Sequence, residues 1–358
     1  MGYYKSSRYG SEGMQYAKIP PEMKEYWENL LKKKTKEERF DRFTEEITNL
    51  PFKELTEGKL FHEQSWVNVK GYPMNGSNGY EFMGGENAVY CMVAQDKKGY
   101  KEPVWIQQSE ISRENARRNK MMSQSGVRIP LVFVAEKDDI VYLSKYFKDG
   151  QETKKVAMYN IEQLVNAPEV KKAPEILPYI TKEREEKLDA FLTKTVKDLG
   201  IKIRHGKYYS ESEFDFKTNT LKLPPKEKYQ DREAYYCGAF FELARYAINQ
   251  KSNLGNADYL SAEISTILMC HKHGINVNLT EKKLYLKTAA KEIVPLMKKN
   301  KSWYTGVLKD GGLATDKLLN HDNTSMKKRD ISKSVSSKDL MDLTPDTSKS
   351  RKGGSRHV

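Results

Sequence analysis

The sequence lacks the features of a membrane protein and of a disulfide-stabilised domain. No apolar run approaches the ~18 residues that a membrane-spanning helix needs, and no apolar segment typical of a signal peptide follows the first residues. The only cysteines are Cys91, Cys237 and Cys270, and each lies in an apolar segment that favours a reduced, buried thiol. We therefore expect a cytoplasmic protein with no membrane partner.

Common catalytic signatures are missing as well. No glycine-rich loop is followed by Lys-Ser or Lys-Thr at the spacing of a phosphate-binding loop, and no serine lies in a nucleophile elbow. The pattern HExxH, in which two histidines on one helical face bind Zn²⁺, is also absent. These absences argue against a nucleotide hydrolase, a serine hydrolase and an intact zinc peptidase.

Positive charge is what the chain has in excess. Its 62 Lys and Arg residues outnumber 49 Asp and Glu residues, which gives a formal net charge of +13. A surplus of this size favours a polyanionic partner, and nucleic acid is the first candidate. The alternative is a basic surface that only keeps the protein soluble.

Changes in composition divide the chain into segments, and both folded segments mix helical and strand patterns. The fold class is therefore predicted as α+β, with an N-terminal domain of α/β type followed by an α+β domain. The predicted segments are a disordered N-terminus (1–20), a first domain (21–165), a proline-rich linker (166–180), a second domain (181–320) and a disordered basic tail (321–358).

The stretch 230–275 predicts two packed helices, and a degenerate motif lies at the centre of the first. The motif reads FELAR, with Glu242 between Phe241 and Arg245. With histidine at both ends it would be a zinc-binding helix, but phenylalanine has no lone pair and arginine keeps its charge. Glu242 and Glu263, which lies on the second helix, give too few ligands for zinc. We expect no metal, no cofactor and no catalytic residues here.

The sequence CHKH, from Cys270 to His273, is the other metal candidate. On a helix the side chains of His271 and His273 point about 200° apart, so they cannot bind one ion unless the helix has ended. Gly274 would permit such an end. The alternative is an ordinary helix C-terminus, where histidine is favoured by the helix dipole. The sequence leaves metal binding by CHKH open.

A basic segment follows VWIQQSEI. Arg113, Arg117 and Lys120 lie at i, i+4 and i+7, on one face of a predicted helix, and Arg118 adjoins them. We expect these four residues to contact a phosphate backbone, with a merely solvated face as the alternative.

Two aromatic residues are the candidates for base stacking, Trp105 and Tyr72. Tyr72 belongs to SWVNVKGYPMNGSNGY, whose glycines and aromatic residues are typical of a loop that receives a planar ligand. The alternative is a long connection whose aromatic residues pack on the domain.

The order of several motifs resembles the ArdC-type antirestriction proteins. The stretch YYSESEFDFKTNTLKLPPKEKYQDREAYY (208–236) is similar to the strand pair and Pro-Pro turn before that family's HExxH helix. Four upstream motifs also fit the family pattern: GGENAVYCM (84–92), VWIQQSEI (104–111), IPLVFV (129–134) and MYNIEQ (158–163). The resemblance covers roughly residues 40–275.

The resemblance implies a domain that binds single-stranded DNA, followed by a zincin-like metallopeptidase domain, in a protein that shields the DNA of a phage, plasmid or other mobile element from host restriction. Because HExxH is degenerate, we expect the second domain to be an inactive pseudoenzyme. Two alternatives stay open: a structural or interaction protein delivered with mobile DNA, whose C-terminal domain binds a protein partner, and an active metallopeptidase, which conflicts with the missing ligands.

The resemblance also implies that Glu242 and Glu263 face each other across the helical hairpin. Two such carboxylates need a cation, and Arg245 lies one helical turn after Glu242. We expect Arg245 to bridge both carboxylates while Phe241 fills the volume of a lost ligand. The alternative is that Arg245 pairs with Glu242 alone.

Overall fold

A computed structural model describes residues 42–76, 85–135, 139–146, 152–170, 179–248 and 255–319. The predictions for the N-terminus (1–20) and for the tail (321–358) lie outside these residues, as does the start of the first predicted domain (21–41). The described residues all belong to one compact unit. No helix among them is both long enough and apolar enough to cross a bilayer.

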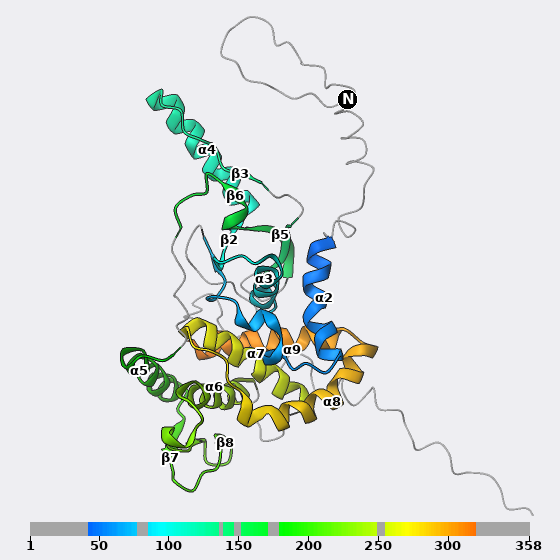
Figure 1. The fold of residues 1–358 in the computed structure, drawn as a ribbon, viewed down its shortest axis with the longest axis vertical. Coiled ribbons are helices and arrows are strands. Elements are labelled where there is room, and N and C mark those ends of the chain that lie inside the picture. The colour runs from blue at the N-terminus through cyan, green and yellow to red at the C-terminus, as the bar shows by residue number, and fades with distance from the viewer. Residues whose placement is uncertain are drawn as a thin grey trace, which may run out of the picture. The chain divides into compact units, whose positions relative to one another are not determined.

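The structure is a mixed α+β fold, as predicted (Figure 1). The α-helices are α2 (Arg42–Thr56), α3 (Gly85–Lys98), α4 (Gln108–Ser125), α5 (Lys182–Asp198), α6 (Arg232–Ile248), α7 (Asn256–His273), α8 (Lys283–Lys299) and α9 (Ser302–Leu318). The 3₁₀ turns are η2 (Phe61–Glu63), η3 (Ser65–Asn68), η4 (Ile161–Gln163), η5 (Lys226–Lys228) and η6 (Thr280–Lys282).

The strands form three small sheets among the described residues. The first has the order β1-β2-β5-β4, with β1 parallel to β2 and the other pairs antiparallel; the second pairs β3 with β6; the third has the order β7-β9-β8. Where the sequence predicted two strands between residues 201 and 223, the structure has three. The strands are β1 (Met74–Asn75), β2 (Val104–Gln107), β3 (Phe133–Val134), β4 (Val141–Tyr146), β5 (Glu152–Asn160), β6 (Leu164–Val165), β7 (Lys202–His205), β8 (Glu213–Asp215) and β9 (Thr220–Leu223).

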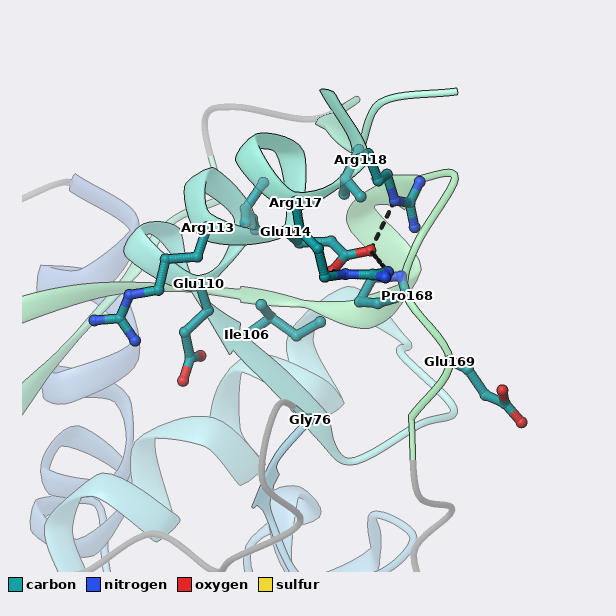
Figure 2. Close-up of a pocket in the computed structure, with 11 residues that line it drawn as sticks. Gly76, Ile106, Glu110, Arg113, Glu114, Arg117, Arg118, Pro168 and Glu169 are labelled. Carbon is teal, nitrogen blue, oxygen red and sulfur yellow. Dashed lines mark hydrogen bonds and ion pairs between the residues drawn. The ribbon is translucent and has the colours of Figure 1, made fainter. Parts of the chain in front are cut away.

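Helix α4 carries the predicted basic segment and is attached mainly through its first turn. The side chain of Glu110 accepts a hydrogen bond from the backbone N–H of Gln107, which caps the start of the helix. Gly126 ends it in the left-handed conformation, with φ 68°. Ile111 is the one residue of α4 that is buried, and it packs with Ile106 of β2. The rest of the helix extends away from the sheet (Figures 1 and 2).

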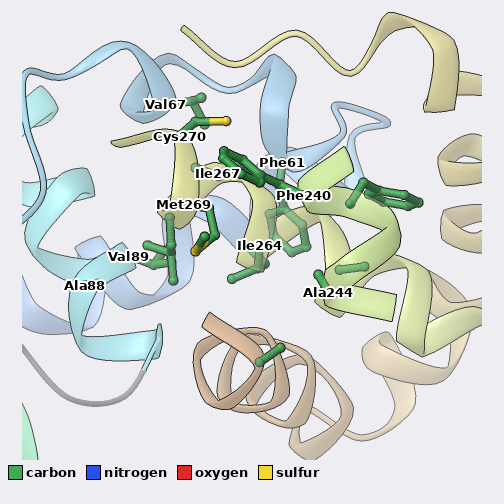
Figure 3. Packing of buried hydrophobic residues seen from close by; sticks show 14 of the residues in the cluster. Phe61, Val67, Ala88, Val89, Phe240, Ala244, Ile264, Ile267, Met269 and Cys270 are labelled. Atoms are coloured by element: carbon green, nitrogen blue, oxygen red, sulfur yellow. The ribbon is translucent and has the colours of Figure 1, made fainter. Parts of the chain in front are cut away.

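The predicted helical hairpin is confirmed as α6 and α7, and it lies at the centre of the main hydrophobic core. Both helices are buried on nearly every side, and α9 packs against α7. Figure 3 shows residues of the hairpin beside Phe61, Val67, Ala88 and Val89, which come from the N-terminal part of the chain. The two predicted domains thus share a core. Their boundaries stay a prediction, and linker residues 171–178 lie outside the described residues.

Candidate functional site

The degenerate motif lies on α6 and buries its carboxylate. Glu242 is 1% exposed. Its Oε2 accepts a hydrogen bond of 3.0 Å from the backbone N–H of Phe214 in β8 and one of 2.7 Å from Arg245 Nη1. The helix therefore directs Glu242 toward the small sheet β7-β9-β8, and the edge of that sheet satisfies one oxygen of the carboxylate.

The other oxygen of this carboxylate meets a buried lysine that the sequence analysis did not single out. Lys282, at the end of η6, is 2% exposed, and its Nζ lies 3.0 Å from Glu242 Oε1. The same ammonium donates a hydrogen bond to the backbone carbonyl of Ser212. No local pattern marks Lys282 among the many lysines of the chain, because its burial depends on how η6 packs against α6.

Further carboxylates surround this ammonium. Glu211 Oε2 and Glu281 Oε1 each lie 3.7 Å from Lys282 Nζ. Burial lowers the pKa of Lys282, but the charges of Glu242 and Glu281 outweigh it, so the net shift of the lysine pKa is upward. Lys282 is therefore a charged ammonium at neutral pH. The pKa of Glu281 is raised, chiefly by burial.

Glu263 has a different partner from the predicted one. It is fully buried on α7, and its Oε1 accepts hydrogen bonds from the backbone N–H of His62, at 2.8 Å, and from the ring Nδ1, at 2.7 Å. The guanidinium of Arg245 instead lies over the ring of Tyr259, 4.8 Å from its centroid. Among the described residues no ion pair joins Arg245 to Glu263.

The predicted arginine bridge is therefore wrong. Glu242 faces β8 and η6, whereas Glu263 faces the η2 turn, which belongs to the N-terminal part of the chain. Arg245 pairs with Glu242 alone, which was the alternative reading of the sequence. Phe241 is fully buried, and Lys282 Nζ lies 5.9 Å from its ring centroid. A cation thus lies beside the Phe241 ring.

The residues of the motif do not fit a metal ion. Within the described ranges, no three His, Cys, Asp or Glu side chains are grouped so that they could hold one. The 3.0 Å and 3.7 Å distances from Lys282 Nζ to its carboxylates are those of ion pairs, so an ammonium already lies among these oxygens.

The CHKH side chains point to three different places. Cys270 Sγ lies 3.3 Å from Cys237 Sγ on α6, and both thiols are free and buried. The ring nitrogens of His271 lie 2.8 and 3.2 Å from the backbone carbonyls of Val67 and Gly71. The ring of His273 packs 4.3 Å from that of Phe191. Helix α7 continues to His273, and Gly274 ends it. The side chains therefore do not converge on one ion.

A second candidate site lies along α4. A hollow of about 480 Å³ separates the start of the helix from β2 and the segment after β6 (Figure 2). Its apolar surface comes from Ile106, Ile111, Val132 and Pro168. Its charged lining consists of Glu110, Arg113, Glu114, Arg117, Arg118 and Glu169, so positive and negative charges balance within it. The hollow as a whole therefore has no net positive charge that would attract an anion. Binding of a phosphate would depend on which of its arginines are unpaired.

The four residues predicted to contact phosphate differ in exposure and in whether their side chains are already paired. Arg113 and Lys120 are exposed, and among the described residues their side chains have no hydrogen bond or ion pair. Arg117 is exposed but donates two hydrogen bonds to Glu114, whose pKa falls to about 2 mainly because of that bond. Arg118 donates to the backbone carbonyls of residues 130 and 166 and is largely buried, so its role is structural.

The two aromatic residues predicted to stack on bases belong to the core. Trp105 is 0% exposed, and Tyr72 is 6% exposed. A ring with no free face cannot receive a base, so this expectation is corrected. The alternative for the segment around Tyr72, that its aromatic residues pack on the fold, is the one observed.

An exposed aromatic ring lies elsewhere on the same part of the chain. Phe133 of β3 is 54% exposed and pairs across the ribbon with Val165 of β6, which is 38% exposed. Its neighbour Val132 is buried, because successive residues of a strand face opposite sides. The residues of IPLVFV are all apolar or proline, so no alternation in the sequence marks Phe133 as exposed.

Comparison with known proteins bears on the fold. No protein-family model and no curated protein sequence matches the chain. Two crystal structures of the antirestriction protein ArdC from plasmid R388, one metal-free and one Mn(II)-bound, match it with TM-scores of 0.53 and 0.52. Each match covers 78% of this chain and 97% of ArdC. The chain has the ArdC fold. At 18% and 17% identity, the likeness to ArdC concerns the fold and confirms the resemblance at that level.

Proposed function

We propose that this chain is an antirestriction-like protein of a phage, plasmid or other mobile element, that it acts in the host cytoplasm, and that it binds single-stranded DNA. Its C-terminal part would be a zincin-like domain without peptidase activity. The observation that carries the proposal is the ArdC fold, which extends over most of the chain. The net charge of +13 supports a polyanionic ligand.

The DNA-binding surface we propose consists of α4 together with the exposed face of the β3–β6 ribbon. The side chain of Asn115 holds the ribbon against the helix through two 2.8 Å hydrogen bonds with the backbone of Val132. Phe133 is the next residue of the ribbon, and its side chain, 54% exposed, faces the side opposite to that of Val132. Arg113 and Lys120 supply unpaired charge. Cations beside an exposed aromatic ring are the combination that binds single strands without reading their sequence.

The lack of peptidase activity is proposed from the site itself. A zinc peptidase needs three protein ligands and a metal-bound water beside a general base. Here Phe241 and Arg245 stand in place of histidines, and both oxygens of Glu242 are held by donors. Because Arg245, Lys282 and the backbone N–H of Phe214 already engage both oxygens of Glu242, this arrangement supports a structural role for the carboxylate over that of a base for a metal-bound water.

A mobility-shift experiment tests the DNA-binding proposal. The purified protein is titrated against a labelled single strand and against the matching duplex over a series of salt concentrations. We expect tighter binding to the single strand and a linear fall of log affinity with log salt. Equal affinity for both forms would contradict single-strand preference. No binding even at low salt would overturn the proposal and favour the alternative role in protein interaction.

A further inference from the structure

The ammonium of Lys282 lies in a cluster made entirely of oxygen atoms. Within 3.7 Å of Nζ are carboxylate oxygens of Glu211, Glu242 and Glu281, and the backbone carbonyl of Ser212 accepts its hydrogen bond. These oxygens come from three separate segments: the residues before β8, helix α6 and turn η6. Hard oxygen ligands converging from several segments are what a divalent cation usually requires.

In this chain the positive charge among these oxygens comes from the ammonium of Lys282. We propose that Lys282 is a tethered cation, which takes over the charge-compensating role of a metal ion at Glu242 and makes this fold stable without metal. The proposal reverses the sequence-based hypothesis, in which Arg245 alone compensated the carboxylates. Arg245 remains a second, more exposed partner of the same carboxylate.

Three observations support a charge role over simple packing. Lys282 is 2% exposed, so its charge would be very unfavourable without partners. Its nearest partner, Glu242, is equally buried and lies 3.0 Å away. Two further carboxylates, those of Glu211 and Glu281, each lie 3.7 Å from Nζ. ArdC, which shares the fold, has been observed with Mn(II) bound.

The first arm of the test uses the wild-type chain. It is purified without chelator, its metal content is measured by mass spectrometry, and its melting temperature is recorded in EDTA and in MnCl₂. We expect substoichiometric metal and the same melting temperature in both, because a ligand stabilises only a state that it binds. Stoichiometric metal, or a loss of several degrees in EDTA, would overturn the proposal.

The second arm separates charge from packing. Lys282→Met keeps the length of the side chain but removes the charge, so Glu242 would be left with one cation. We expect its melting temperature to fall by roughly 10 °C. The matched control is Lys283→Met, since Lys283 is more exposed and its ion pair with Glu63 lies at the surface; its change should stay within about 2 °C.

A double variant completes the design. Glu242→Gln combined with Lys282→Met removes both charges, so it should melt above Lys282→Met alone. A double variant that melts below the wild type by the sum of the losses of Glu242→Gln and Lys282→Met would show that the two charges do not compensate each other. If Lys282→Met yields no folded protein, a folded double variant supports the proposal, and a double variant that also fails to fold contradicts it.

The result is independent of DNA binding. The inference concerns the proposed inactive domain, whereas all these variants leave α4 and β3 unchanged, so mobility shifts of the folded variants should match the wild type. If the protein depends on metal but binds single strands, only the proposed role of Lys282 is overturned. If the protein is independent of metal but binds no DNA, only the DNA-binding proposal is overturned.

Discussion

His62 and Glu263 are 201 positions apart in sequence, yet one carboxylate oxygen of Glu263 accepts hydrogen bonds from both the backbone N–H and the ring Nδ1 of His62. The pair joins the η2 turn of the N-terminal part to helix α7. Glu263 is fully buried and the His62 side chain nearly so. In this chain the carboxylate thus joins two parts of one core through the His62–Glu263 contact.

We predict that the His62–Glu263 contact contributes measurably to stability. His62→Ala should lower the free energy of unfolding by about 2–3 kcal/mol, because it leaves a buried carboxylate short of a donor. Glu263→Gln retains an acceptor oxygen and should cost less than about 1 kcal/mol. Urea denaturation of both variants measures the difference. Equal, small effects would show that the contact adds nothing to stability.

We predict unequal contributions from the cations of α4. Arg113→Ala and Lys120→Ala should each reduce the slope of log affinity against log salt by about 0.7, the value for one contact to a single strand. Arg117→Ala should change it less, because Glu114 already neutralises Arg117. Glu114→Gln should tighten binding by releasing that arginine. Mobility shifts over a salt series measure all four, and identical slopes would contradict the assignment.

We predict that Phe133 stacks on a base. Phe133→Ala should weaken binding to a single strand by about 1–3 kcal/mol. Its melting temperature should hardly change, because the ring is more than half exposed. Leu284→Ala is the matched control, since Leu284 is exposed on α8, and its affinity should equal that of the wild type. A loss of melting temperature without a loss of affinity in Phe133→Ala would show a packing role instead.

We predict a pH dependence that originates at Asp310 of α9. Burial, together with the charge of Asp258, raises the pKa of Asp310 from 3.8 to about 6. The native state therefore binds this proton more tightly than the unfolded chain, so the free energy of unfolding falls as pH rises from about 4 to 6.

Replacement of the carboxyl tests this sign. Asp310→Asn should raise the free energy of unfolding at pH 7.5 by up to about 3 kcal/mol, since each pKa unit corresponds to 1.36 kcal/mol. The gain should vanish near pH 4. Urea denaturation at both pH values measures it, with Glu227→Gln at an exposed position as the control. A gain that persists at low pH would assign the effect to packing.

Periodicity along the sequence determined much of the local structure. The apolar repeats of residues 230–275 predicted helices α6 and α7, and Gly274, with positive φ, follows α7 where a helix end was considered. The motif FELAR also predicted the absence of a zinc site, because the chemistry of Phe241 and Arg245 does not depend on their surroundings. The order of the motifs was enough to predict the ArdC fold.

Burial and the pairing of charges were decided by the tertiary structure alone. An aromatic residue in a strand or loop has the same local pattern whether it faces solvent or the core, so Trp105 and Phe133 could not be told apart by propensity. Lys282 and His62 find their carboxylates across 40 and 201 positions, because packing brings η6 to α6 and η2 to α7. Such contacts depend on which surfaces meet, and local periodicity specifies only which surfaces are apolar.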